Sequence, residues 1–174
     1  MEIHIRPAQP EHFPRLRDIE LAAFETLRAA GGVTGPATAN SVDDFSAFSR
    51  NGLLLVACTP GGTPAGFVAG ECDGPWLHIA EIDVHPDWQQ NGISRLLMQA
   101  ILRAGRQRGM AGATLTTDNI AAFNARFYAS LGFTIVDGQA RPPHLARLHA
   151  TEQAQGFDPS RRVTMLMTLP ASCE

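Results

Sequence analysis

The stretch HIAEIDVHPDWQQNGISRLL, residues 78–97, decides the fold that we expect for this chain. Its first half carries β-branched Ile79, Ile82 and Val84 among small and polar residues, which predicts a strand. The strand ends before Pro86, because proline restricts the residue before it and has no N–H to donate to a sheet. After this break the chain turns and becomes a helix.

The helix has one apolar face, and its N-terminus follows directly on a tight turn. The apolar residues at three- and four-residue spacing are Ile93, Leu96, Leu97, Ala100, Ile101 and Ala104. The first N–H groups of a helix have no intrahelical partner and carry roughly half a positive charge, so such a turn can bind an anion. Gly92 would let a bulky phosphate approach the backbone. A plain strand–turn–helix without a ligand remains the alternative.

The turn fits a phosphate-binding pattern other than the two commonest nucleotide loops. G-x-x-x-x-G-K-[ST] is absent from the chain, and a dinucleotide fingerprint needs three spaced glycines. Gln89, Gly92 and Ser94 fit the pattern Q/R-x-x-G-x-G/A. The stretch therefore resembles the pyrophosphate loop of the GNAT superfamily, the acyl-coenzyme A-dependent N-acyltransferases. That family usually has Gly or Ala where Ser94 stands, and Ser crowds the turn slightly but keeps the N–H and adds a hydroxyl that can contact phosphate.

A second segment, NARFYASLGF at residues 124–133, resembles the N-x-x-(x)-Φ-Y-x-x-L-G-F segment of the same family. Asn124 and Tyr128 are four residues apart and share one helix face. Gly132 permits the positive φ that ends the helix, and Phe133 returns to the core. Half-buried tyrosines are common in any protein, so the resemblance is specific only because this segment follows the first motif across one strand.

The resemblance covers about residues 3–169, and it implies an α/β fold. It is strong over residues 78–133 and loose where the acceptor would bind. Residues 142–145 and 156–162 look like a bacterial GNAT subgroup with an extra C-terminal helix before the last strand. We therefore expect a single domain over residues 1–174, with a mixed sheet of about seven mostly antiparallel strands, splayed near Val84 and flanked by helices.

The expected elements follow from periodicity and from turn residues. Strands are expected near residues 3–6, 53–58, 65–71, 77–84, 112–117, 133–136 and 162–169, and helices near 11–30, 42–50, 92–108, 120–131 and 144–155. The first four strands read as an antiparallel meander, and the following strand–helix–strand unit implies a right-handed crossover to a parallel partner. In GNAT proteins the first two helices commonly wall the acceptor site. We interpret the charged residues there as a solvated helix face, although carboxylates lining the entry would help to attract a cationic amine. These residues are Glu20, Glu25, Arg28, Asp43 and Asp44.

Composition narrows the class of protein further. Hydrophobic residues make up 44% and charged residues 18%, which is typical of a globular domain. A net charge of −3 and a pI near 6.0 argue against a nucleic-acid binder. Three cysteines without a C-x-x-C argue against a disulfide framework or a zinc site, and we expect no metal. The N-terminal residues contain no apolar h-region and the sequence contains no 18-residue apolar run, so we expect no membrane association and a cytoplasmic location.

The resemblance implies direct acetyl transfer from acetyl-coenzyme A to an amine. A primary amine with a pKa near ~10 must lose a proton before it attacks a thioester, and the departing thiolate needs a proton. Tyr128 matches the family's tyrosine and is the implied acid. Glu81 is the expected base, directly or through a water, with a purely structural pairing as the alternative. Alternation puts His78 opposite Glu81 and Asp83 unless a bulge intervenes, and His78 and His85 read as polar surface or edge residues.

The resemblance also implies where acetyl-coenzyme A lies. Main-chain amides near Val84 would hold the acyl and pantetheine groups, the loop would hold the pyrophosphate, and Asn124 would contact the pantetheine arm. The expected coenzyme-binding residues are Ile82, Asp83, Val84, Gln89, Gln90, Asn91, Gly92, Ile93, Ser94, Arg95, Asn124 and Phe127. The expected acceptor is a small-molecule primary amine. A protein N-terminus or lysine as acceptor, and a non-catalytic acyl-coenzyme A-binding regulatory module, remain open. Members of the family commonly form homodimers, so the resemblance implies a possible homodimer.

Overall fold

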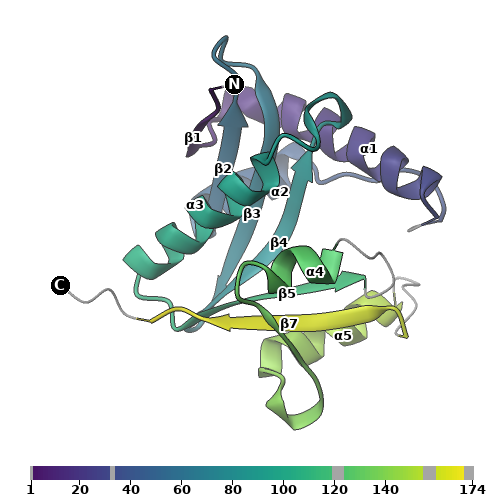
Figure 1. Ribbon diagram of the computed structural model, residues 1–174, viewed down its shortest axis with the longest axis vertical. Coiled ribbons are helices and arrows are strands. Elements are labelled where there is room, and N and C mark those ends of the chain that lie inside the picture. The colour runs from purple at the N-terminus through teal and green to yellow at the C-terminus, as the bar shows by residue number, and fades with distance from the viewer. Residues whose placement is uncertain (1, 32–33, 119–123, 155–159, 171–174) are drawn as a thin grey trace.

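The strands form one mixed sheet that runs through the middle of the molecule. A computed structural model describes residues 2–31, 34–118, 124–154 and 160–170 (Figure 1). Within these residues the strand order is β1-β2-β3-β4-β5-β7-β6. The strands are β1 (His4–Pro7), β2 (Leu53–Cys58), β3 (Pro64–Asp73), β4 (Trp76–Val84), β5 (Gly112–Asp118), β6 (Thr134–Val136) and β7 (Arg162–Thr168). All neighbours are antiparallel except β4 and β5, which confirms the predicted meander and parallel crossover.

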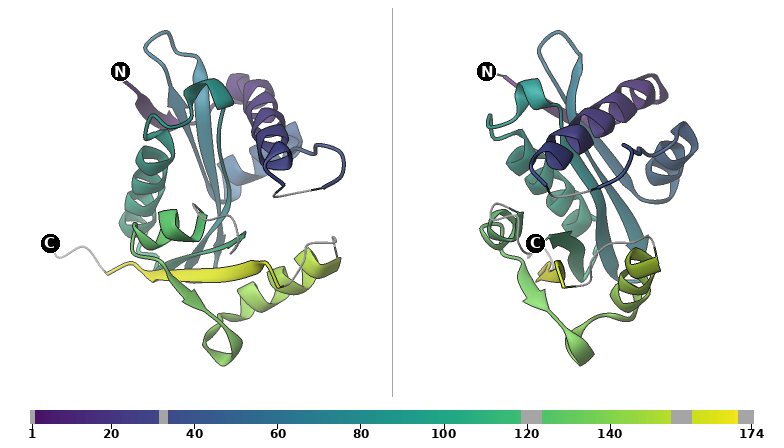
Figure 2. Two further views of the ribbon diagram at one scale, coloured as in Figure 1. Left: turned by 45° about the vertical axis from the view of Figure 1, so that its right-hand side comes forward. Right: turned by 90° about the vertical axis from the view of Figure 1, so that its right-hand side faces the viewer.

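The helices cover both faces of the sheet. They are α1 (Phe13–Ala29), α2 (Val42–Asn51), α3 (Ile93–Gln107), α4 (Asn124–Ala129) and α5 (Pro143–Ala154), with 3-10 turns at Pro10–His12, Pro86–Trp88 and Gly138–Ala140. α3 lies against one face, and α1 and α2 lie against the other (Figure 2). The predicted start of α4 at residue 120 and the predicted end of α5 at residue 155 lie outside the described residues. α5 is the expected extra helix before the last strand.

Two hydrophobic cores form because helices pack on both faces. On the α3 side, residues such as Leu55, Leu97 and Ile101 are buried together. On the α1–α2 side, the rings of Phe45 and Phe67 pack edge to face with centroids 5.4 Å apart. Because the middle of the sheet is covered twice, every residue of β2 is buried, as its continuous apolar run indicates. In the described part of the chain, no helix is long and apolar enough to cross a membrane.

The pairing of β4 with β5 is short, and this opens the sheet. Trp76–His78 pair with residues 112–114, and the pairing stops there although both strands continue. β5 pairs instead with β7 along its whole length. Beyond His78, the edge of β4 that faces β5 therefore has no partner strand in the part of the chain that the structure describes. The predicted splay is present, but it begins just after His78 and earlier than the expected position near Val84.

Candidate active site

A β-bulge in β4 decides which of its side chains share a face. β3 pairs with Ile79 and then with Glu81, so Ala80 is left without a partner on β3. A bulge adds one residue to one strand and shifts the alternation of its side chains. The β4 residues that pack into the α3-side core are accordingly Leu77, Ile79, Ile82 and Val84. Simple alternation, which would place His78 opposite Glu81 and Asp83, is therefore wrong here, and the three lie on one face.

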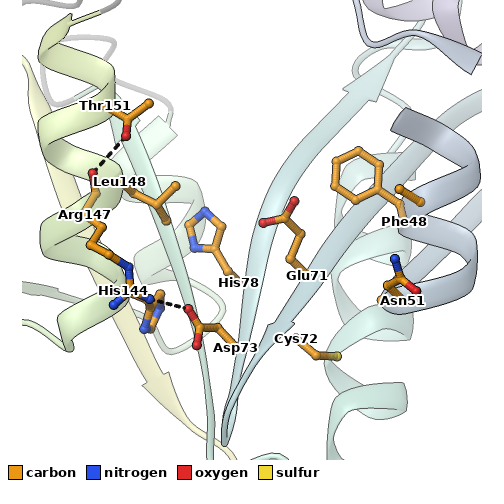
Figure 3. Close-up of a pocket in the computed structure, with 12 residues that line it drawn as sticks. Phe48, Asn51, Glu71, Cys72, Asp73, His78, His144, Arg147, Leu148 and Thr151 are labelled. Carbon is orange, nitrogen blue, oxygen red and sulfur yellow. Dashed lines mark hydrogen bonds and ion pairs between the residues drawn. The ribbon is translucent and has the colours of Figure 1, made fainter. Parts of the chain in front are cut away.

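His78 is buried, and this corrects the interpretation of it as a surface or edge residue. Its side chain is 6% exposed, and its Nδ1 lies 3.1 Å from Oγ1 of Thr114 on β5. The same oxygen lies 2.8 Å from Nε2 of His144 on α5. Burial, and then the neighbouring His144, lower the pKa of His78 to about 4. Both rings line a cavity of about 380 Å³ between α2 and α5 (Figure 3).

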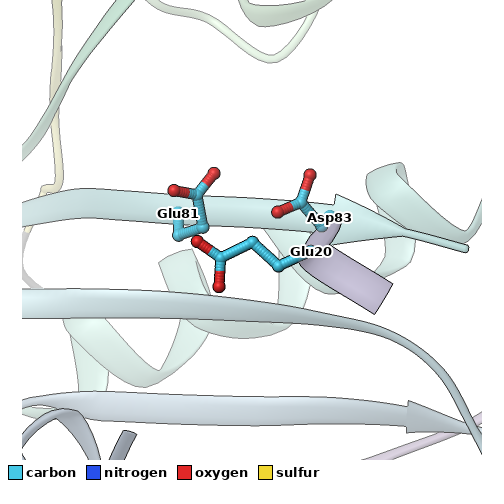
Figure 4. A group of neighbouring side chains, drawn as sticks. All are labelled: Glu20, Glu81 and Asp83. Carbon is cyan, nitrogen blue, oxygen red and sulfur yellow. The ribbon is translucent and has the colours of Figure 1, made fainter. Parts of the chain in front are cut away.

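Beyond the bulge, three carboxylates from two elements meet (Figure 4). Glu81 and Asp83 of β4 and Glu20 of α1 each place a carboxylate oxygen within 4.8 Å of the others. Glu20 accepts hydrogen bonds from the main-chain N–H of Asn40 at 3.0 Å and from its side-chain amide at 2.9 Å. Glu20 is buried, so its interpretation as a solvated residue is wrong. It stands four residues after buried Leu16, and this helical spacing was the available signal.

The other charged residues of that predicted helix face are exposed, as expected. They are Glu25, Arg28, Asp43 and Asp44. Asp44 instead helps to begin α2, because its carboxylate accepts from Ser41 N–H at 2.8 Å and its N–H donates to Ser41 Oγ at 3.1 Å. His85 is partly buried, and its Nδ1 accepts from the N–H of Asp87 at 3.3 Å. We assign His85 no part in the site.

Burial raises the pKa of every carboxyl in the cluster. Loss of hydration, and then the charge of Glu20, raise the pKa of Glu81 to about 7. Burial, and then Glu81 and Glu20, raise the pKa of Asp83 well above its usual range. Burial also raises the pKa of Glu20. A hydrogen bond joins Glu81 and Asp83, so they titrate as a pair that holds a proton near neutral pH. Such a pair is suited to taking a proton from a bound ammonium.

Tyr128 of α4 lies near the same pair of carboxyls. Its ring packs edge to face against Phe127 and Phe133, with centroids 5.2 and 6.1 Å away. Burial, and then the charges of Glu81 and Asp83, raise the pKa of Tyr128. The phenol therefore keeps its proton at neutral pH and can donate it.

The turn before α3 presents a row of unused main-chain donors. Gln90 and Gly92 have positive φ angles of 62° and 76°. Within the described residues, the N–H groups of residues 90–95 donate to no protein acceptor, and the next N–H, of Leu96, donates to Gly92 O at 3.2 Å. A Cβ on Gly92 would meet no atom within 4 Å, so the space beside this row is open. Consecutive free N–H groups at a helix N-terminus fit a ligand with several anionic oxygens.

Two side chains of the loop hold its shape. Gln89 donates to Val84 O at 3.0 Å, so it ties the loop back to the end of β4. Asn91 donates to Trp88 O at 3.2 Å and to Gln89 O at 3.0 Å. These side chains therefore shape the row of donors, whose N–H groups stay free for a ligand.

Arg95 connects this loop to the helix that carries Tyr128. Its guanidinium donates to Ser130 Oγ at 2.8 Å and lies 5.7 Å above the centre of the Phe127 ring. Asn124 is the first residue of α4, and its side chain lies outside the part of the chain that the structure describes. The predicted coenzyme-binding residues Arg95 and Phe127 thus belong to one contact between α3 and α4.

The sequence analysis did not select several residues that lie near the site. Arg162 of β7 bonds Glu152 of α5 at 2.7 Å, and its charge slightly offsets the raised pKa values of Glu81 and Tyr128. Asn40 lies in a loop, and nothing in its neighbourhood marks it as the partner of Glu20. These contacts join residues far apart in sequence, so local spacing does not reveal them.

A splayed sheet, a row of main-chain donors at the start of α3, and a phenol and paired carboxyls near the open edge of β4 form the arrangement that we expect of an N-acyltransferase. The sequence profile of the acetyltransferase (GNAT) family matches residues 13–133. The chain therefore belongs to the GNAT family of acetyltransferases.

The chain is similar to several known acetyltransferases. It is 33% identical over 104 residues to the mycothiol acetyltransferase of Nocardiopsis dassonvillei, a match that covers 55% of this chain and 31% of that protein. It thus spans about a third of that relative's length. The ribosomal-protein-S18-alanine N-acetyltransferase of Escherichia coli shares its fold, with a TM-score of 0.71 at 19% identity over 99% of this chain and 97% of that one. The PaiA N-acetyltransferase of Thermoplasma acidophilum, solved with coenzyme A, has a TM-score of 0.68 at 14% identity over 97% and 99%.

Proposed function

We propose that this protein transfers the acetyl group of acetyl-coenzyme A directly to the primary amine of a small molecule. The observation that carries the proposal is that Tyr128 lies close enough to the Glu81–Asp83 pair for their charges to raise its pKa, beside the open edge of β4. A proton donor and a proton acceptor would thus both be near the place where a thioester would react.

The free donors of residues 90–95 would hold the pyrophosphate of the coenzyme. From there the pantetheine arm would run along the edge of β4, where the main chain of Ile82, Asp83 and Val84 has no strand partner on the β5 side among the described strands. An extended arm with amide groups suits such an edge, because it can replace the missing strand. The coenzyme A bound by the Thermoplasma acidophilum relative supports this choice of co-substrate.

The carboxylates of Glu20, Glu81 and Asp83 would attract an ammonium group to the other side. The Glu81–Asp83 pair takes a proton from the ammonium, and the free amine attacks the carbonyl carbon. A C–N bond forms and the C–S bond breaks as the tetrahedral intermediate collapses. Tyr128 supplies the proton that the departing coenzyme A thiolate takes up, and the second proton that the amine nitrogen loses on becoming an amide restores the phenol.

The test is release of coenzyme A thiol with a panel of small amines and short peptides. We expect turnover of small amines, and in Tyr128→Phe a kcat lower by about 100-fold or more with a nearly unchanged KM for acetyl-coenzyme A. Phe keeps the ring packing, so a lost fold would show separately as a lower Tm. Turnover of peptides but of no small amine would mean that the acceptor is a protein amine and not a small-molecule amine. Tight binding of acetyl-coenzyme A without turnover of any acceptor would favour a non-catalytic module.

A further inference from the structure

The cavity between α2 and α5 contains a polar arrangement that the proposed transfer does not use (Figure 3). His78 and His144 line it, and both are at least nine-tenths buried. The hydroxyl of Thr114 lies between the two rings, 3.1 Å from His78 and 2.8 Å from His144. Two other lining residues, Asp73 and Arg147, pair with each other at 2.8 Å.

The single hydroxyl proton of Thr114 fixes how the two rings are protonated relative to each other. Within the described residues its oxygen has no other side-chain partner, so it donates to one ring and accepts from the other. Burial lowers the pKa of both histidines, so both are neutral at pH 7. Each neutral ring has one N–H and one bare nitrogen. Whichever way the hydroxyl points, one ring is left with an N–H and the other with a lone pair that has no partner among the described residues.

We propose that this cavity is an acceptor subsite that binds a neutral amide group carried by the amine substrate. An amide offers one N–H donor and one C=O acceptor, which match the free lone pair and the free N–H of the two rings. An ammonium has no acceptor for the ring N–H, and a carboxylate has no donor for the ring lone pair. Each mismatch leaves a buried polar group unpaired. The ring centroids lie 6.0 Å apart, which suits a group with separate nitrogen and oxygen atoms better than a single hydroxyl.

This inference rests on the proposed function for the position of the reacting amine. His78 and Glu81 share one face of β4 on the two sides of the bulge. Strand geometry separates them by about 7 to 10 Å, which corresponds to roughly five methylene groups between the amine and the amide. A small ω-amino amide or the backbone amide of a peptide supplies the same chemistry, and the experiment below distinguishes the two sources.

The first measurement compares kcat/KM for four amines of similar length. They are ε-aminocaproamide, heptylamine, ε-aminocaproate and hexamethylenediamine. We expect ε-aminocaproamide to exceed each of the others by about tenfold or more, since each of them leaves at least one ring group unpaired. A triglycine amide added to the series tests the peptide source. Equal or better turnover of the diamine, the carboxylate or the alkylamine would overturn the proposal.

Variants of the positioning residue Thr114 give the second measurement. Thr114→Val keeps the shape but removes the hydroxyl, so we expect the preference for the amide to fall to about onefold, chiefly through a higher KM for the amide. Thr114→Ser keeps the hydroxyl and should keep the preference. Thr117→Val is the matched control, because Thr117 is also buried on β5 but three residues along, on the other face. An amide preference that survives in Thr114→Val would contradict the proposal.

A binding readout separates this inference from the transfer reaction. Hexanamide carries the amide but no amine, so it can occupy the cavity without reacting. We expect it to shift the imidazole ¹⁵N resonances of His78 and His144 in the native protein and not in Thr114→Val. Ring shifts without acetylation of any amine would sink the proposed function and leave the subsite standing. Acetylation of amines with neither ring shifts nor an amide preference would contradict the subsite and leave the proposed function standing.

Discussion

The proposed coenzyme side of the splayed sheet is built from main chain, whereas the proposed acceptor side is built from side chains. On the first side, residues 90–95 offer consecutive N–H groups, and Gln89 and Asn91 only hold them in place. On the second side, Glu20, Glu81 and Asp83 come from two elements and act through their charge. A main-chain site depends on local conformation, so it tolerates many side chains but few changes of φ. A side-chain site depends on each group and on its ionisation.

The largest effect should come from the side-chain site. Glu81→Gln should lower kcat/KM by about 100-fold or more, because it removes half of the pair that takes the proton. In the native enzyme the pair must lose a proton to act, so kcat/KM should fall as the pH drops through about 7. This dependence should disappear in the variant. Glu25→Gln, which removes an exposed carboxylate paired with Arg28, is the control. An unchanged pH profile in Glu81→Gln would place the base elsewhere.

Stability should respond to pH with opposite signs at two buried groups. The pKa of Glu81 is raised from 4.5 to about 7, so its contribution is present below 4.5 and is lost as pH rises through 7. The pKa of His78 is lowered from 6.5 to about 4, so its contribution is present above 6.5 and is lost as pH falls through 4. Each is worth at most about 3 kcal/mol.

Chemical denaturation of two variants between pH 4 and 8 separates these contributions. Relative to the native protein, Glu81→Gln should lose less stability as pH rises, and His78→Gln should lose less as pH falls. Matching slopes in all three proteins would mean that neither group has the shifted pKa assigned to it.

The main-chain site should be sensitive to φ at one position. Gly92 and Gly109 have φ angles of 76° and 72°, and a Cβ on either would meet no atom within 4 Å. Gly92→Ala and Gly109→Ala should therefore each lose about 1 to 2 kcal/mol of stability from backbone strain. Only Gly92→Ala should also weaken coenzyme A binding, by about tenfold, because it alone disturbs the row of donors. Calorimetric titration of both variants decides this, and equal affinities would break the comparison.

The smallest effect on coenzyme A affinity should come from replacing a side chain in the loop whose main chain would bind the coenzyme. Ser94→Gly keeps the N–H at that position, so the Kd for coenzyme A should change by less than about threefold. The same titration measures it. A loss beyond tenfold would show that the hydroxyl of Ser94 binds phosphate more strongly than the main chain does, and the contrast between the two sides would no longer hold.

The sequence predicted the loop well and the acceptor side only in part, for one physical reason. The glycine turn and the N-terminus of α3 depend on neighbouring residues, and the first motif contains them all. The bulge residue is an alanine, which has no special preference for a bulge, and its place follows from pairing with β3. The contacts of Glu20 with Asn40 and of His78 with Thr114 join residues 20 and 36 positions apart. Such contacts appear only once the chain has folded.

The short seam between β4 and β5 makes the sheet two half-sheets joined over a few residues. One half-sheet contains β1 to β4, and the other contains β5 to β7. A coenzyme lying along the free edge of β4 would contact both half-sheets and restrain their motion relative to each other. Its binding should then slow hydrogen exchange in β5 and β7 as well as in the loop that it touches. Slowing confined to the loop would mean that the two half-sheets are already held together without the coenzyme.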